Sequence, residues 1–364
     1  MQLLRKQALT SLSTTSRDGT PIKNIESELK KELKYFTSLI LLSKSKSNSS
    51  FVYILTKQTT KLGILGVPFC KGQTKQGVER APDLLRQVGL MEKLKAVANE
   101  IKDYGNLQYE IDSSNKNTFQ NMRNYGEFMG CNRALVAKIQ EILKENDQVL
   151  TIGGDHAIGF GSVAGSLQHS SDLSLIWIDA HADINLHITS ESGNIHGMPV
   201  SFLLQELRTY WKNLFTIYIG LRDIDPYEAF ILRKLGIRAY SMDHIDKYGI
   251  AKIIEKTLDA LNPNNKLHVS FDIDALDSSV APSTGTVVSG GLTLREGISI
   301  VEALRDTNRV QSIDLVELNP FVGTEQDVQT TIVSSMEILK SLCGYKRSGN
   351  IANINEDVFS RIIK

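Results

Sequence analysis

Short apolar runs alternate with helix-like segments through most of this 364-residue chain. Such alternation predicts a parallel sheet with helices between its strands. Eight runs have the length and composition of strands: 61–69, 100–104, 148–152, 173–178, 214–219, 236–240, 267–271 and 310–316. A helix is expected around Pro82 to Leu94. The predicted fold is therefore α/β, a single domain with a parallel sheet of about eight strands and helices on both faces.

The two ends of the chain differ from this pattern. The first sixty residues are rich in Ser and Thr and have no acidic residue before Asp18, which resembles a weak transit peptide. The charged segment 26–34 that follows has the pattern of an amphipathic helix. We expect residues 1–60 to be a partly helical or mobile extension, residues 61–347 to be one catalytic domain, and residues 348–364 to be a tail.

Composition limits the class of partner. Lys plus Arg and Asp plus Glu both number 41, so no net charge favours nucleic acid or anionic lipid. Apolar stretches fall far short of the roughly 20 residues that cross a membrane. Three widely spaced cysteines without a CxxC motif argue against a disulfide framework or a zinc-thiolate site. A small-molecule partner and a cytoplasmic location are expected, with mitochondria as the alternative.

Metal-ligand side chains follow three of the predicted strands. The run 173–178 ends in Asp179-Ala-His181-Ala-Asp183, and alternate residues of an extended chain point to the same side. The run 267–271 ends in Asp272-Ile-Asp274, and the run 148–152 leads into Gly153-Gly-Asp155-His156. In open parallel sheets ligands bind outside the carboxyl ends of the strands. These side chains are therefore expected to converge.

Charge decides what the converging side chains can bind. Four carboxylates packed together would repel one another, whereas two divalent cations would neutralise four negative charges. We therefore expect a two-metal centre with the ligands His156, Asp179, His181, Asp183, Asp272 and Asp274. Oxygen and imidazole donors without a thiolate favour manganese, Mn²⁺. Two such ions about 3.5–4 Å apart activate a bridging water, which predicts a metal-assisted hydrolase.

Several motifs between residues 61 and 347 point to one family. They are Gly66-Val-Pro-Phe-Cys-Lys-Gly-Gln, Gly153-Gly-Asp-His, Asp179-Ala-His-Ala-Asp-Ile-Asn, Gly193-Asn-Ile-His-Gly, Ser270-Phe-Asp-Ile-Asp and Val316-Glu-Leu-Asn-Pro. In order and spacing the chain resembles the ureohydrolases, and the arginases in particular. The resemblance implies an arginase-like fold and hydrolysis of L-arginine to L-ornithine and urea. It also implies a homotrimer, with Arg295 and Arg347 as candidate interface charges.

The resemblance also implies a role for each site residue. Asp179 and Asp272 would bridge the two ions, and Asp183 would orient the attacking hydroxide. Glu317 would bind the guanidinium, whose paired N–H groups present a planar fork to two carboxylate oxygens. His196 would pass a proton to the leaving amine, because an imidazole titrates near the working pH.

Recognition of the amino-acid end of the substrate is implied in the same way. Asn185, Ser190, Ser192 and Asn194 would bind the carboxylate, Asp225 with Glu228 the α-ammonium, and Thr286 would support the site. Two departures stand out in this chain. His187 and Glu191 place a titratable side chain and an acid near the expected carboxylate position, and the turn around Asp277 lacks the glycine and proline of related chains.

Other functions compete with this reading. Agmatinase, which acts on decarboxylated arginine, is the nearest. A dinucleotide site is suggested by the GxGxxxG pattern from Gly159 to Gly165, but that pattern begins six residues after Gly153 rather than directly after its strand. A single-zinc deacylase would not need six ligands. A non-catalytic scaffold would not need His196 and Glu317.

Overall fold

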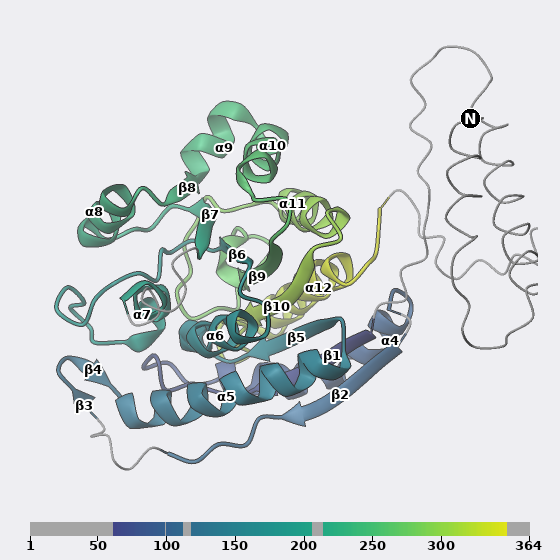
Figure 1. Cartoon of the computed structure of the whole chain (residues 1–364), viewed down its shortest axis with the longest axis horizontal. Helices are drawn as coiled ribbons and strands as arrows, with labels where there is room; N and C mark the ends of the chain where they lie inside the picture. Colours follow the sequence, from purple (N-terminus) through teal and green to yellow (C-terminus); the bar gives the residue numbers. More distant parts are fainter. Residues whose placement is uncertain (1–60, 99, 112–117, 206–213, 348–364) are drawn as a thin grey trace, which may run out of the picture. The chain divides into compact units, whose positions relative to one another are not determined.

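Eight parallel strands form one sheet in a computed structural model of the chain, which describes residues 61–98, 100–111, 118–205 and 214–347 (Figure 1). The sheet order is β2-β1-β5-β10-β9-β6-β7-β8. The strand bounds are β1 Lys61–Val67, β2 Glu100–Asn106, β5 Gln148–Gly153, β6 Leu173–Ile178, β7 Phe215–Leu221, β8 Arg238–Ser241, β9 Lys266–Asp272 and β10 Val310–Val316. The predicted eight-stranded parallel sheet is confirmed. The predicted extension over 1–60 and tail over 348–364 lie outside the described residues.

Helices cover both faces of this sheet, as the sequence predicted. On one face, apolar side chains of five helices are buried together with Ile176 and Ile178 of β6. These helices are α3 (Ala81–Gln87), α4 (Leu90–Lys95), α10 (Ile250–Ala260), α11 (Leu294–Asp306) and α12 (Glu325–Leu342). On the other face α5 (Tyr125–Glu145) packs in one cluster, and α6 (Gly159–His169), α7 (Pro199–Gln205) and α8 (Pro226–Leu235) pack in another with Leu175 and Trp177 of β6. Alternate side chains of β6 thus pack on opposite faces of the sheet. Because helices cover both faces, the whole strand is buried.

The helix predicted around Pro82 to Leu94 is in fact two helices, and that prediction was wrong. α3 spans Ala81–Gln87 and α4 spans Leu90–Lys95. Gly89 lies between them with a φ of 90°. A left-handed backbone ends one helix and starts another, and glycine adopts it without a steric penalty.

A short antiparallel hairpin lies outside the main sheet. It joins β3 (Thr118–Phe119) to β4 (Met122–Arg123) and leads directly into α5. Two short helices, α9 (Met242–Tyr248) and α10, follow β8. Among the described residues, no helix is both long and apolar enough to cross a bilayer.

Strand order brings the predicted ligands together. β5, β10, β9 and β6 are neighbours in the sheet, and Val316 of β10 pairs with Asp272 of β9. The residues that follow these four strands therefore emerge at one edge of the sheet. That edge is the carboxyl edge, where parallel α/β sheets bind ligands.

Candidate metal centre

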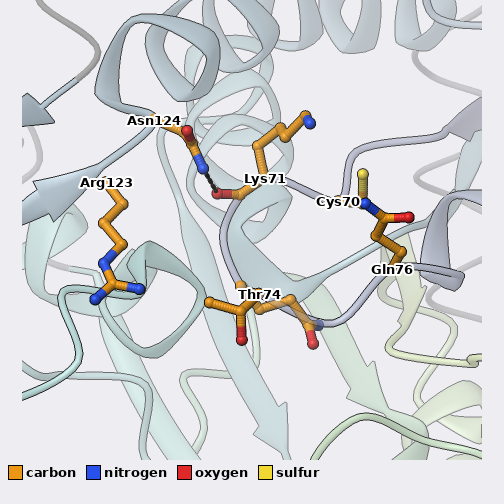
Figure 2. A pocket seen from close by; sticks show the side chains of 7 residues that line it. Cys70, Lys71, Thr74, Gln76, Arg123 and Asn124 are labelled. Carbon is orange, nitrogen blue, oxygen red and sulfur yellow. Dashed lines mark hydrogen bonds between the residues drawn. The ribbon is translucent and has the colours of Figure 1, made fainter.

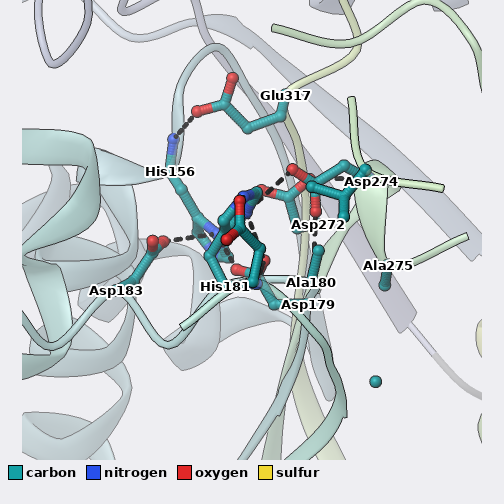
Figure 3. A network of polar contacts seen from close by, with 12 residues as sticks. His156, Asp179, Ala180, His181, Asp183, Asp272, Asp274, Ala275 and Glu317 are labelled. Carbon is teal, nitrogen blue, oxygen red and sulfur yellow. Dashed lines mark hydrogen bonds and ion pairs between the residues drawn. The ribbon is translucent and has the colours of Figure 1, made fainter. Parts of the chain in front are cut away.

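Four buried carboxylates and two imidazoles meet at this edge (Figure 3). His156 follows β5, and Asp179, His181 and Asp183 follow β6. Asp272 is the last residue of β9, and Asp274 lies in the short helix after it. Asp179 is 0% exposed and Asp272 is 2% exposed, so water does not screen their charges. All six residues that the sequence predicted as metal ligands are therefore brought into one cluster.

His156 stands at the centre of the first group. Its Nδ1 atom lies 3.0 Å from Asp179 Oδ2, 3.1 Å from Asp183 Oδ2 and 3.1 Å from Asp272 Oδ2. This nitrogen is buried and forms no hydrogen bond with any of them. A buried polar atom without a partner is costly, but the ligand atoms of His156, Asp179 and Asp272 lie close enough together to hold one small cation, with Asp183 beside them. The arrangement fits a divalent ion.

A second group shares Asp179 with the first. Asp179, His181 and Asp274 offer ligand atoms close enough to bind one ion, as do His156, Asp179 and Asp272. His181 Nδ1 lies 3.4 Å from Asp179 Oδ1 and 3.2 Å from Asp274 Oδ2. One carboxylate with an oxygen in each group is the arrangement that a bridging ligand requires. Asp272 contacts the first group, and its Oδ1 atom accepts a hydrogen bond from Asp274 N at 2.8 Å.

Electrostatics make the cluster unfavourable without cations. Burial and the charge of Asp274 raise the pKa of Asp272, and burial and the charge of Asp179 raise the pKa of Asp183 to about 6. Burial also acts against ionised Asp179, but the two imidazoles outweigh it and lower the pKa of that carboxyl. Divalent ions would relieve this repulsion and favour ionisation of every carboxylate.

Buried polar groups hold the His156 imidazole on its Nε2 side, away from the metal-binding carboxylates. Its Nε2 atom lies 2.9 Å from Ser270 Oγ, which donates to Asp314 Oδ2 at 3.1 Å, and His268 Nε2 lies 2.8 Å from the same oxygen. The imidazole also stacks on Trp177, with ring centroids 3.9 Å apart. Such partners fix the ring plane and the tautomer of a metal-binding histidine.

Two acidic residues of the site have strained backbones. Asp183 has a φ of 49° and Glu317 a φ of 64°, both in the left-handed region. Residues other than glycine rarely adopt this conformation, which costs on the order of 1–3 kcal/mol at each position. Strain of this kind is typical of functional sites, where it aims a side chain that a relaxed backbone would direct elsewhere.

Glu317 follows β10 and reaches the cluster from one side. Its Oε1 atom accepts hydrogen bonds from His156 N at 3.0 Å and shares a 3.0 Å contact with His196 Nδ1. Its Oε2 atom accepts from Gln73 Nε2 at 2.6 Å. Burial opposes charge on both partners of the His196–Glu317 contact, but their attraction outweighs it. The pKa of His196 rises to about 9, and that of Glu317 falls.

The comparison with known families decides the classification. A model described as "Arginase family" matches residues 60–344. The chain belongs to the arginase family. Human Arginase-1 is 41% identical over 314 residues, which cover 81% of this chain and 97% of that protein. Human "Arginase-2, mitochondrial" is 39% identical over 315 residues, which cover 81% and 88%.

Solved arginase structures share this fold. An arginase from Bacillus caldovelox has a TM-score of 0.73 and 32% identity, with 79% of this chain and 99% of that chain covered. As a member of the arginase family, the chain is a hydrolase that acts on carbon–nitrogen bonds.

In this arginase-family chain the predicted carboxylate-binding residues lie on one loop, 185–194. Asn185 donates to Asp225 Oδ2 at 2.8 Å and accepts from Thr189 Oγ1 at 3.0 Å. Ser190 Oγ accepts from Gly193 N and Ser192 Oγ accepts from Asn194 N. Within the described residues neither serine hydroxyl donates a hydrogen bond, so both can donate to a ligand, whereas the Asn185 amide already donates to Asp225.

The predicted ammonium-binding residues also have structural partners. Asp225 caps α8, and the Glu228 carboxylate accepts hydrogen bonds from Asp225 N and Ile184 N at 3.1 Å each. Burial and the charge of Asp183 raise the pKa of Glu228 to about 7. Glu228 thus connects α8 to the metal-binding loop. Thr286 is exposed, in a different loop.

The turn around Asp277, which departs from the family pattern expected from the sequence, is closed by hydrogen bonds to one side chain. The Asp277 carboxylate accepts hydrogen bonds from Ser279 N at 3.0 Å, Gly290 N at 2.7 Å and Gly291 N at 3.0 Å. A hydrogen bond from the Ser279 side chain, together with these backbone bonds, lowers the pKa of Asp277 to about 2. A side chain therefore provides the closure that backbone conformation could otherwise provide.

The glycines of the GxGxxxG pattern pack α6 against its neighbours. A Cβ atom on Gly159 would meet Trp177 at 2.7 Å, on Gly161 Asn132 at 2.6 Å, and on Gly165 Ile139 at 2.8 Å. Gly161 N also donates to Asn132 Oδ1. Close helix packing accounts for these glycines, which removes the basis for the dinucleotide alternative.

Sequence reasoning missed residues that support the site. Gln73 binds Glu317, and Asp155 accepts from Gly72 N at 2.7 Å and Ala157 N at 3.1 Å. Burial and the charge of Glu317 raise the pKa of Asp155 to about 8. Both residues stood inside motifs that carried the family resemblance, and that position was the available signal. Ser270 also stood in such a motif, whereas Asp314, inside an apolar strand, had no such signal.

Proposed function

We propose that this chain hydrolyses L-arginine to L-ornithine and urea with two Mn²⁺ ions. The observation that carries the proposal is the position of Glu317. Its carboxylate accepts a hydrogen bond from the backbone of His156, whose imidazole faces three carboxylates of the metal centre. A guanidinium bound by Glu317 would therefore have its carbon beside the metal centre.

The proposed ligand set is the one that the sequence suggested. His156, Asp179, Asp183 and Asp272 would bind one ion, and Asp179, His181, Asp272 and Asp274 the other. Carboxylate and imidazole donors without a thiolate are the support for manganese. Bound divalent ions supply Lewis-acid activation of water at neutral pH.

Two side chains would position the reactants: Glu317 would bind the guanidinium and Asp183 would orient the water. A carboxylate has about four acceptor positions, and Glu317 uses three of them for His156, His196 and Gln73. The substrate guanidinium would take the fourth and compete with Gln73 for Oε2. Asp183 would accept a hydrogen bond from the attacking water and orient it.

Proton transfer would fall to His196. Its Nδ1 atom faces Glu317, and no hydrogen bond joins its Nε2 atom to any residue that the structure describes. The side chain is 21% exposed, so Nε2 can meet a substrate. As water adds to the guanidinium carbon and the bond to the chain nitrogen breaks, the imidazolium would give its proton to the departing amine.

Assembly and location are part of the proposal. A homotrimer is proposed by family analogy. Arg295 is exposed, whereas Arg347 binds Glu302 within the same chain at 2.8 Å, so Arg295 is the better candidate interface charge. Residues 61–347 would be the catalytic domain. We propose a cytoplasmic location, and fractionation of cells that express the full chain would distinguish it from a mitochondrial one.

Urea release tests the proposed reaction. Mn²⁺-loaded protein is incubated with L-arginine and separately with agmatine, each beside a sample treated with a chelator. We expect urea from L-arginine and none after chelation. Glu317→Gln should lose about 100-fold or more in kcat/KM, because it removes a charged partner of the guanidinium. Glu325→Gln, at an exposed position at the start of α12, is the matched control.

Three results would contradict the proposal. Preference for agmatine would identify an agmatinase. No urea from either substrate, with two ions bound, would identify a scaffold. Full activity in Glu317→Gln would remove Glu317 from the substrate site.

A further inference from the structure

A pocket of about 510 Å³ opens beside the proposed active site (Figure 2). Its lining residues come from the loop after β1 and from the β3–β4 hairpin: Cys70, Lys71, Gln73, Thr74, Gln76, Arg123 and Asn124. None of them is a metal ligand or one of the predicted substrate-binding residues. The pocket is therefore a separate part of the site.

The loop that lines the pocket also touches the reactive groups. Gln73 Nε2 donates to Glu317 Oε2 at 2.6 Å, and His196 N donates to Gly72 O at 3.1 Å. Asn319 Nδ2, two residues beyond Glu317, donates to Gln76 O at 3.0 Å. A molecule whose guanidinium lies at Glu317 would thus have this pocket next to it.

The hairpin side of the pocket is fixed to the predicted substrate loop. Arg123 N donates to Gly193 O at 3.0 Å, and Asn121 Nδ2 donates to Ser190 O at 2.5 Å. A Cβ atom on Gly193 would lie 2.0 Å from Asn121 O, so the two segments are in close contact. Arg123 therefore stands directly beside the loop that carries Ser190 and Ser192.

Two cations line the pocket, and they point in different directions. Figure 2 shows the Arg123 guanidinium on the same side as the Thr74 hydroxyl, whereas the Lys71 ammonium points the opposite way. No ion pair or hydrogen bond engages either cationic group within the described residues. Arg123 thus lines the pocket with a guanidinium that no residue in the described part of the chain engages.

We propose that this pocket is a subsite for the α-carboxylate of the substrate and that Arg123 is its cation. The inference rests on the proposed function, because it takes the substrate to be an amino acid. A guanidinium binds a carboxylate through two parallel hydrogen bonds. The hydroxyls of Ser190 and Ser192 would complete the subsite from the neighbouring loop.

The charges of the site require such a cation. The carboxylates of Asp225, Glu228 and Glu317 lie near the proposed substrate site and would favour the guanidinium and ammonium groups of the substrate. The same acids repel a carboxylate. Arg123 offsets that repulsion at one end of the substrate and so would favour L-arginine over a decarboxylated analogue.

The test compares two charge removals in one pocket. For Arg123→Gln we expect a KM for L-arginine about 10-fold higher, with kcat nearly unchanged, since a hydrogen bond to a charged group is lost. Lys71→Gln removes the same charge from the same pocket, but its ammonium lies on the opposite side from Arg123 and from the substrate loop that Arg123 contacts, so the KM of this variant should change less than about 2-fold. Arg123→Lys should recover part of the loss.

Binding of two diamines separates the subsite from the reaction. L-ornithine has the carboxylate and 1,4-diaminobutane lacks it, and calorimetry on Mn²⁺-loaded protein measures both without turnover. Arg123→Gln should weaken L-ornithine about 10-fold and leave 1,4-diaminobutane unchanged. The calorimetric measurement tests the subsite even if the wild-type protein releases no urea from L-arginine. Absence of urea would refute the proposed function but not the subsite.

Three outcomes would overturn the subsite. Equal weakening of both diamines would show a general electrostatic effect. Equal effects of Lys71→Gln and Arg123→Gln would show the same. In the third outcome, Arg123→Gln leaves L-ornithine binding unchanged, while inorganic phosphate binds the wild-type protein but not this variant. That result would show that the pocket binds a free anion instead.

Discussion

His156 Nε2 and Ser270 Oγ lie 2.9 Å apart, behind the metal centre. Ser270 gives its own hydrogen to Asp314 at 3.1 Å, so its oxygen accepts from the imidazole. Nε2 therefore carries the proton, and the lone pair of Nδ1 faces Asp179, Asp183 and Asp272. The hydrogen bond selects the tautomer that can bind a metal.

Removal of the Ser270 hydroxyl tests this relationship. Ser270→Ala should weaken Mn²⁺ binding about 10- to 100-fold, because the imidazole loses the partner that fixes its tautomer. Calorimetric titration of metal-free protein measures the affinity. Ser335→Ala, at a buried serine of α12 that bonds to Thr331 O, is the matched control. Equal Mn²⁺ affinity in the two variants would refute the role of Ser270.

The shared position of Asp179 predicts unequal effects of two substitutions. Asp179→Asn should remove both ions, because Asp179 belongs to both groups, whereas Asp274→Asn should remove the ion of one group. Metal content after dialysis, measured by mass spectrometry, distinguishes them. Asp259→Asn, at an exposed position of α10, should keep two ions per chain. Two ions retained by Asp179→Asn would exclude a bridging role.

The sequence predicted the sheet and the ligands for the same physical reason. Buried parallel strands are continuous apolar runs, so Asp179 and Asp272 stand out at the points where such runs end. Gly89 shows the limit at the level of elements. A glycine within a helical pattern is compatible with one helix or two, and composition alone does not reveal its φ of 90°.

Supporting residues were harder to predict because their partners are distant in sequence. Gln73 binds Glu317 across 244 positions, and Ser270 binds His156 across 114. Local periodicity contains no information about such pairs. Asp314 is a buried acid in an apolar strand, and only its contacts with Ser162, Ser270 and His268 explain it.

The contact between His196 and Glu317 predicts a shifted titration. The pKa of His196 is raised to about 9 in the folded protein, above the unperturbed value of about 6.5. The contact therefore stabilises the fold fully below pH 6.5, and this contribution is lost as the pH rises through about 9.

Proton NMR of the His196 ring in metal-free protein measures that titration. Glu317→Gln should move the midpoint back toward about 6.5, because the favourable charge is removed. An unchanged His196 midpoint in Glu317→Gln would show that Glu317 does not set the pKa of His196.

Two glycines with similar backbones predict different costs of substitution. Gly193 and Gly236 have φ values of 70° and 65°, so alanine is strained at both by on the order of 1 kcal/mol. At Gly236 the new Cβ atom would have no neighbour within 4 Å, whereas at Gly193 it would lie 2.0 Å from Asn121 O. Gly193→Ala must therefore also separate the β3–β4 hairpin from the substrate loop.

Urea unfolding measures the two costs. The free energy of unfolding should fall by about 1 kcal/mol in Gly236→Ala and by more than about 2 kcal/mol in Gly193→Ala, and the KM for L-arginine should rise only in Gly193→Ala. Equal stability losses and equal KM values would mean that the hairpin and the loop are not coupled.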